Sequence, residues 1–174
     1  IGGNAMIFYG LREQTKDMDI VFFDRKNIAA ITQIVKNHPL FKQSKITKKL
    51  PYELKPELLK RGEPTVIQDT DLPRLDLFYK FVFSIDIKDI FKECKRSMRF
   101  DLLKLRLLEP EHLIFLKGIT GRPIDREDIE RITKSLKVNW NYFLELAKKY
   151  YKKDRKVIWL LLDNLYEIYK KEKG

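Results

Sequence analysis

Two aspartates separated by a single residue constrain the fold more than any other feature of this sequence. Residues 17–22 (Asp-Met-Asp-Ile-Val-Phe) have the composition of a β-strand, and residues i and i+2 of a strand project from the same face. We therefore expect the carboxylates of Asp17 and Asp19 to lie together, with Met18 turned to the core. Two neighbouring carboxylates repel each other unless a cation neutralises them. Their oxygens are the ligands that Mg²⁺ and Mn²⁺ prefer.

Two glycines precede these aspartates at the start of an apolar, helix-like run. Gly2 and Gly3 come directly before a helix expected over residues 4–11. A pair of glycines by itself is typical of a turn, but at the start of a helix it lets backbone N–H groups approach a phosphate closely. A phosphate-binding loop beside a dicarboxylate metal site indicates phosphoryl or nucleotidyl transfer.

A third acid is expected on another strand. Residues 73–79 (Pro-Arg-Leu-Asp-Leu-Phe-Tyr) alternate in a strand-like pattern that places Asp76 on the same face as Arg74. If this strand lies beside the first, Asp76 completes a set of three carboxylates. Such a set can hold two metal ions about 3.5–4 Å apart. Asp69 and Asp71 are alternatives for the third position, although they fall in an expected turn.

Together these motifs resemble the DNA polymerase β-like nucleotidyltransferase superfamily. Within it the chain looks most like the prokaryotic branch of minimal nucleotidyltransferases that includes the AbiEii-type toxins. The first motif consists of Gly-Gly-Asn-Ala-Met at residues 2–6, Arg12, Thr15, Asp17-x-Asp19 and the distant Asp76. The second consists of a helix opened by Pro110-Glu111, an inward Lys117, and the element Arg122-x-x-Asp125-x-x-Asp128. The resemblance covers residues 1–132, with a poorly matching middle.

The sequence departs from this family at two places. Many members have Gly-Ser where this chain has Gly2-Gly3, so Asn4 or the backbone alone would contact the phosphate. The resemblance also leads us to expect a first core strand before the glycines, of which this sequence holds only Ile1. Without that strand, the sheet would have an open edge.

The resemblance implies an α/β (α+β) fold in two parts. Residues 1–108 would form the nucleotidyltransferase-like catalytic core, a mixed sheet flanked by helices, and residues 109–174 a C-terminal helical bundle. Asp17, Asp19 and Asp76 would be the catalytic residues and the ligands of Mg²⁺ (or Mn²⁺). The nucleotide would be bound by Gly2, Gly3, Asn4, Arg12, Lys117 and Asp125.

Plain structural roles also remain open for these residues. Asp17 and Asp19 could be solvated acids at the end of a strand, and Asp76 could face water on an edge strand. Arg12 is equally a cation at the end of a helix, stabilised by the helix dipole. Lys117 lies on an otherwise apolar helix, where a lysine can extend its charged end to water. Asp125 is equally an acid in the first turn of a helix, the position that the dipole favours for a negative charge.

The implied reaction transfers a nucleoside monophosphate from ATP or another NTP to an acceptor hydroxyl and releases pyrophosphate. The acceptor stays open between tRNA, another RNA, a protein side chain and a small molecule. Two other functions also stay open. One is a catalytically inactive module that binds nucleotide or RNA, and the other is a toxin–antitoxin component whose helical tail binds a cognate protein partner.

Composition bounds these alternatives. The 174 residues carry a formal net charge of +11, which favours polyanionic partners such as nucleic acid, although a lysine-rich surface also simply keeps a protein soluble. A single cysteine, Cys94, excludes an internal disulfide and fits a reducing cytoplasm. The longest apolar run, residues 157–162, is too short to span a membrane, and no signal peptide opens the chain. We therefore expect a cytoplasmic protein without a membrane partner.

The remaining pattern predicts further helices and strands. Helices are expected over residues 25–37, 52–61, 87–96, 125–137 and 139–152, from Pro110, and from Asp154; strands are expected over 41–46, 65–68 and 98–108. The inward faces of the last two helices would carry Trp140, Phe143, Leu144, Ala147, Ile158, Leu161, Leu162, Leu165 and Ile168. The basic run at residues 148–156 is either a solvated loop or a contact for RNA phosphates.

Overall fold

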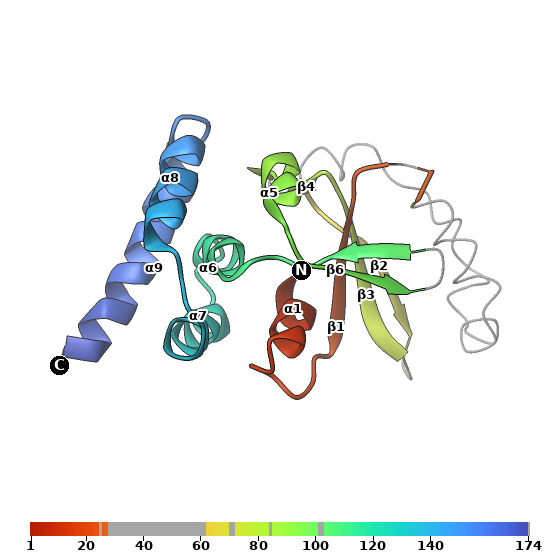
Figure 1. Cartoon of the computed structure of the whole chain (residues 1–174), viewed down its shortest axis with the longest axis horizontal. Coiled ribbons are helices and arrows are strands. Elements are labelled where there is room, and N and C mark those ends of the chain that lie inside the picture. The colour runs from red at the N-terminus through yellow and green to blue at the C-terminus, as the bar shows by residue number, and fades with distance from the viewer. Residues whose placement is uncertain (25, 28–61, 70–71, 84, 101–102, 174) are drawn as a thin grey trace. The chain divides into compact units, whose positions relative to one another are not determined.

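The chain is a mixed α+β protein. A computed structural model describes residues 1–24, 26–27, 62–69, 72–83, 85–100 and 103–173. Its elements are α1 (Gly2–Phe8), β1 (Asp17–Phe22), β2 (Thr65–Asp69), β3 (Leu72–Tyr79), β4 (Phe81–Val82), β5 (Ile85–Asp86), α5 (Lys88–Glu93), β6 (Ser97–Phe100), β7 (Leu103–Arg106), α6 (Pro110–Gly118), α7 (Pro123–Ser135), α8 (Trp140–Tyr151) and α9 (Arg155–Lys173) (Figure 1). Within this described part, no helix is long and apolar enough to cross a bilayer.

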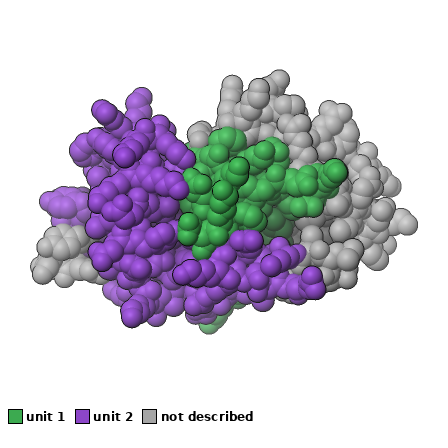
Figure 2. Space-filling model, turned by 45° about the horizontal axis from the view of Figure 1, so that its top comes forward, with its two compact units in different colours: residues 1–7, 12–93 green, residues 8–11, 94–174 purple. Residues whose placement is uncertain are grey.

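Two compact units divide the chain, and Figure 2 shows them in different colours. Unit 1 consists of residues 1–7 and 12–93, and unit 2 of residues 8–11 and 94–174. Unit 1 therefore contains the sheet of β1, β2 and β3, and unit 2 contains the four helices α6 to α9.

The sheet of unit 1 has the strand order β1-β3-β2. β1 runs parallel to β3, and β2 runs antiparallel to it. The central position of β3 explains why residues of both its faces, from Leu75 to Phe78, are buried, since a central strand is covered on both sides. The strands predicted over residues 17–22, 65–68 and 73–79 are confirmed within one or two residues.

The first helix lies two to three residues earlier than predicted. It starts at Gly2 rather than after the glycines, and ends at Phe8 rather than at Leu11. Gly10 has a φ of +70°, a left-handed conformation that commonly ends a helix because glycine has no Cβ to oppose it. The helix propensity of glycine, which is low in a helix interior, does not prevent Gly2 and Gly3 from forming the first turn.

Helix α6 is the centre of unit 2. It contacts α7, α8 and α9, and each of its residues from Pro110 to Gly118 is buried. A helix buried on all sides is typical of the centre of a helical bundle, and its buried polar side chains, Glu111, His112 and Lys117, all have partners. Pro110 occupies the first turn, as predicted. At the other end, a Cβ on Gly118 would overlap the Leu161 side chain, so glycine lets α9 pass close to α6.

The outer helices begin at capping residues. The Asn139 side chain accepts a hydrogen bond from the Tyr142 backbone nitrogen (3.1 Å) at the start of α8. Asp154 accepts one from Val157 (3.3 Å) at the start of α9. Both caps satisfy backbone N–H groups that a helix leaves without partners.

Pro123 was predicted to precede its helix, but it is the first residue of α7. The missing N–H of proline costs nothing there, because the first N–H groups of a helix have no partner within the helix.

Three side chains predicted to face the core of this bundle are exposed. The buried residues of α8 are Phe143, Leu146, Ala147 and Tyr150, and those of α9 include Ile158, Leu161 and Ile168. Trp140 and Leu144 are exposed. The buried face of α8 consists of positions 143, 146, 147 and 150, and Trp140 and Leu144 lie outside this face. Leu162 is exposed for the same reason, since Leu161 occupies the inward position.

Several other predictions have mixed outcomes. The helix predicted over 87–96 is shorter, Lys88–Glu93, and an Asp86 oxygen accepts a hydrogen bond from the Lys88 nitrogen at its start (2.9 Å). The segment 98–108 holds two strands, β6 and β7, which pair with each other. The two-residue strands β4 and β5 were not predicted, because two residues show no periodicity. The elements predicted over 41–46 and 52–61, and all but residues 26–27 of the helix over 25–37, lie outside the described residues.

Candidate active site

The pairing of β1 with β3 gathers the predicted acids on one face of the sheet. Asp19 is the register partner of Asp76, and Asp17 is the partner of Arg74. Register partners on neighbouring strands project from the same face about 4.8 Å apart, and positions i and i+2 share that face. Three carboxylates and one guanidinium therefore share a small area of the sheet. The adjacency of the two predicted strands, which sequence reasoning left as a condition, is a feature of the fold.

Asp76 is held by Arg74. The Nε atom of Arg74 donates to one Asp76 oxygen at 2.6 Å and Nη2 donates to the other at 2.9 Å. This two-point pairing is the strongest arrangement that arginine makes with a carboxylate. It raises the pKa of Arg74, chiefly through the hydrogen bond to Asp76, with smaller contributions from the charges of Asp76, Asp17 and Asp19. Sequence reasoning placed Arg74 on this face but did not predict the pair.

The donors at this site match the chemistry of Mg²⁺ or Mn²⁺. All three acids offer carboxylate oxygens, and Arg74 is a cation that pairs with Asp76 on this face. Asp76 is only 7% exposed, so it requires a cation close by. As the side chains stand, however, Arg74 takes both Asp76 oxygens. In the described part of the chain, no three His, Cys, Asp or Glu side chains are grouped closely enough to hold a metal ion.

The glycines of α1 pack against this acidic face. A Cβ on Gly2 would overlap the Asp19 carboxylate. A Cβ on Gly3 would lie 2.5 Å from the Thr15 hydroxyl, and it would be 3.7 Å from an Arg12 side-chain nitrogen. Only glycine permits so close an approach. The first turn of α1 thus lies directly beside the start of β1.

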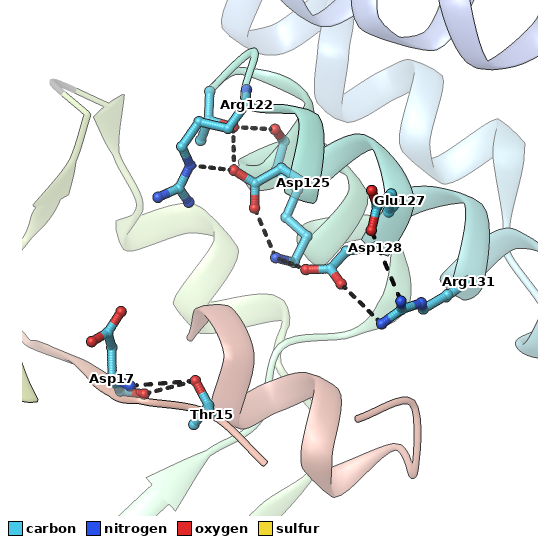
Figure 3. A network of polar contacts seen from close by, with 9 residues as sticks. Thr15, Asp17, Arg122, Asp125, Glu127, Asp128 and Arg131 are labelled. Atoms are coloured by element: carbon cyan, nitrogen blue, oxygen red, sulfur yellow. Dashed lines mark hydrogen bonds and ion pairs between the residues drawn. The ribbon is translucent and has the colours of Figure 1, made fainter. Parts of the chain in front are cut away.

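Two polar side chains fix the start of β1. Asn4 donates from Nδ2 to the Asp17 carbonyl oxygen (2.9 Å). The Thr15 hydroxyl donates to the same carbonyl (3.1 Å) and accepts a hydrogen bond from the Asp17 nitrogen (3.4 Å) (Figure 3).

Met18, predicted to turn to the core, is 43% exposed. The strand pattern fixes only that Met18 faces away from the acids. The opposite face of β1 is exposed to solvent at this residue.

We expect Gly2→Ala to destabilise the protein more than Gly10→Ala. Both glycines have a positive φ (+59° and +70°), so both variants carry the same backbone strain of about 1–2 kcal/mol. A Cβ at Gly10 meets nothing within 4 Å, whereas one at Gly2 overlaps Asp19. Overpacking adds about 1–3 kcal/mol. Urea unfolding of the two variants measures the difference, and equal losses would contradict the contact between Gly2 and Asp19.

The other predicted binding residues lie in unit 2. Lys117 of α6 is only 7% exposed. Its Nζ donates to Asp125 (3.0 Å) and to Asp128 (2.6 Å), both on α7 (Figure 3). Lys117 therefore does not extend its charged end to water. The resemblance singled out Asp125 for the nucleotide, and the structure shows that Asp128 shares its lysine.

Further donors surround Asp125. Its second oxygen accepts hydrogen bonds from the Thr120 hydroxyl (2.6 Å) and from Nε of Arg122 (2.5 Å). Burial acts to raise the pKa of Asp125, but the hydrogen bonds from Arg122 and Thr120 and the charge of Lys117 outweigh it, so the pKa is lowered. This network joins α6 to α7 whether or not it also binds a ligand.

A cysteine and a histidine meet in unit 2, a pairing that sequence reasoning missed. Cys94 Sγ lies 3.9 Å from Nδ1 of His112. That nitrogen accepts a hydrogen bond from the Glu109 backbone (3.3 Å), and Nε2 lies 2.7 Å from the Tyr142 hydroxyl. Burial raises the pKa of Cys94 to about 11, with Glu109 adding to the shift. A thiol that stays protonated is a poor nucleophile, so we assign the pair no catalytic role.

The chain was also compared with known proteins. A scan against protein-family models gives no match, and a search of curated proteins gives none either. Unit 1 brings together Gly2, Gly3, Asn4, Arg12, Asp17, Asp19 and Asp76, and unit 2 brings together Lys117 and Asp125. Sequence reasoning missed the roles of Thr15 and Arg74. The signal available in the sequence is their position, because each lies two residues before a site aspartate, Thr15 before Asp17 and Arg74 before Asp76.

Proposed function

We propose that this protein is a metal-dependent nucleotidyltransferase with its metal site on β1 and β3. The observation that carries the proposal is the register of these strands, which sets Asp19 beside Asp76 and places Asp17 on the same face. Three carboxylates from two adjacent strands are the ligands expected of a site that binds Mg²⁺ with a triphosphate. The finer assignment of the mixed sheet to the nucleotidyltransferase-like fold is part of this proposal.

Asp17, Asp19 and Asp76 would hold the metal. When bound, Mg²⁺ supplies the positive charge that steadies the phosphates and lowers the pKa of the acceptor hydroxyl. The chain itself contributes position. Asn4 and Thr15 fix the backbone at Asp17, and the close approach of Gly2 keeps the Asp19 carboxylate beside the first turn of α1. Mg²⁺ at these carboxylates would offset their repulsion of the phosphates of an NTP, so we expect binding of the nucleotide to depend on the cation.

The proposed substrates are ATP or another NTP and an acceptor that carries a hydroxyl group. The net charge of +11 favours an RNA acceptor, tRNA among them, over a neutral small molecule. The roles of Lys117 and Asp125 toward the nucleotide stay predictions from the resemblance. Each of them already has a charged partner within unit 2.

The test is a transfer assay on matched variants. The purified protein is incubated with each α-³²P-labelled NTP, Mg²⁺ and total RNA, and both labelled product and released pyrophosphate are measured. Asp19→Asn removes one proposed ligand. Asp24→Asn changes an exposed aspartate five positions further along, whose carboxylate accepts a hydrogen bond from the Lys26 nitrogen (2.9 Å).

We expect transfer by the wild type and by Asp24→Asn, and none by Asp19→Asn or in EDTA. Transfer that survives both Asp19→Asn and EDTA would overturn the proposal. The same would follow if wild-type protein neither transferred label nor bound any NTP in the presence of Mg²⁺.

A second candidate is a nucleic-acid-binding module without turnover. The observation that favours it is the exposed turn between α8 and α9, where Lys152, Lys153 and Arg155 accompany Tyr151, and the exposed Trp159 follows one helical turn later. Cations with exposed aromatic rings are typical of surfaces that bind single-stranded nucleic acid. Salt-sensitive binding of RNA without Mg²⁺, together with no release of pyrophosphate, would favour this function.

A further inference from the structure

The pairing of Arg74 with Asp76 bears on how the proposed metal site works. Both Asp76 oxygens accept hydrogen bonds from the guanidinium, at 2.6 and 2.9 Å. When the two oxygens of a carboxylate each accept one N–H group of the same arginine, the side of the carboxylate that faces the arginine is occupied. A metal ion that approaches Asp76 from this side therefore competes with Arg74 for the same oxygens.

The two partners differ in how readily they can leave. The Arg74 side chain is 39% exposed and that of Asp76 is 9% exposed. A guanidinium that swings outward regains hydrogen bonds with water, whereas a buried carboxylate left without a cation has none to gain. Exchange of one cation for another at Asp76 is therefore easier than loss of the cation without replacement.

We propose that Arg74 is an exchangeable counterion of Asp76, which holds this ligand in place and competes with the divalent metal for it. The inference rests on the proposed function, since it assumes that the metal binds at Asp76. As a consequence, the apparent metal affinity equals the intrinsic affinity multiplied by the fraction of molecules in which Asp76 is not paired with Arg74. A pair with one part-exposed partner favours the paired form by about five- to tenfold.

Metal binding to variants of the whole chain tests this. The free Mn²⁺ signal in electron paramagnetic resonance is followed while EDTA-treated protein is titrated, without nucleotide. Arg74→Gln removes the competing charge. Arg74→Lys keeps the charge but cannot form the two-point pair. Lys88→Gln is the matched control, because it removes one positive charge from an exposed position of the same unit.

We expect Arg74→Gln to bind Mn²⁺ about five- to tenfold more tightly than wild type, and Lys88→Gln to change the affinity less than twofold. Arg74→Lys should lie between them, which keeps the test informative if Arg74→Gln fails to fold. In EDTA, Arg74→Gln should unfold at lower urea concentration than Lys88→Gln, because Asp76 has lost its partner. A purely structural pair would show this second effect and not the first.

The outcomes separate the inference from the function. Wild-type binding with no tightening in Arg74→Gln and Arg74→Lys would overturn the exchange and leave the proposed function standing. Tightening in both variants without any NTP transfer would support the exchange and count against the function. No Mn²⁺ binding by any variant would overturn both.

Discussion

The Asp76→Asn variant is expected to lose transfer of nucleoside monophosphate by a factor of at least about 10³, because a metal ligand contributes several kcal/mol to stabilising the charge of the reaction. The amide keeps the shape of the side chain and still accepts one hydrogen bond from Arg74. Arg74 is partly exposed and can satisfy its remaining donors with water. We therefore expect a loss of stability of only about 1 kcal/mol. Labelled-NTP transfer and urea unfolding measure the two effects separately.

The matched control for this variant is Asp86→Asn. Asp86 also lies in a strand of unit 1, and its carboxylate accepts a hydrogen bond from the backbone at the start of α5. It should keep the activity of the wild type. If Asp76→Asn retained more than a tenth of the wild-type activity, Asp76 would not be a metal ligand, whatever the fate of Asp17 and Asp19.

The largest loss of stability is expected from Lys117→Met. Methionine fills a similar volume but leaves two carboxylates, Asp125 and Asp128, without their shared cation in a buried position. Removing one member of a buried ion pair costs about 3–5 kcal/mol, a large part of the stability of a typical domain. Urea unfolding at pH 7 measures it. The control is Lys134→Met, because Lys134 is exposed and its longer ion pair with the part-buried Glu130 (3.9 Å) should contribute less than about 1 kcal/mol.

The pH dependence identifies the origin of that loss. The pKa of Asp125 is lowered in the folded protein, so its charge stabilises the fold above its ordinary pKa, and this contribution disappears as the pH falls through the lowered value. The difference between Lys117→Met and wild type should therefore shrink below about pH 4, the usual range of aspartate. Adding Asp128→Asn to Lys117→Met should recover part of the stability at pH 7. A loss that is independent of pH and not recovered would indicate a packing defect instead.

The sheet around the candidate site could be largely predicted from the sequence. Alternation in residues 17–22 and 73–79 identifies both strands, and the same period puts Asp17 and Asp19 on one face. Their adjacency is a long-range property that local periodicity does not contain. Sequence reasoning left it as a condition, and the structure pairs β1 with β3.

What could not be predicted depends on side chains meeting across the fold. Arg74 was expected on the face of Asp76, but its two-point bond depends on rotamers that a period of two does not fix. Lys117 was expected to face inward from an apolar helix, but its two partners, Asp125 and Asp128, come from the neighbouring helix α7. The prediction that Trp140 faces the core was wrong. Helical spacing shows which residues share one face of a helix, but it does not show which face packs against the other helices.

The path of the chain through its two units affects the order in which the protein can be completed during synthesis. Residues 8–11 belong to unit 2 although they are made first, and the Tyr9 hydroxyl donates to the Leu108 carbonyl (2.9 Å), 99 residues further along. At about 5–20 residues per second, a ribosome makes Leu108 about 5–20 s after Tyr9. Residues 8–11 consequently wait for the later part of unit 2 to be made. A fragment that begins at Cys94 would lack these residues and the hydrogen bond from Tyr9 to Leu108.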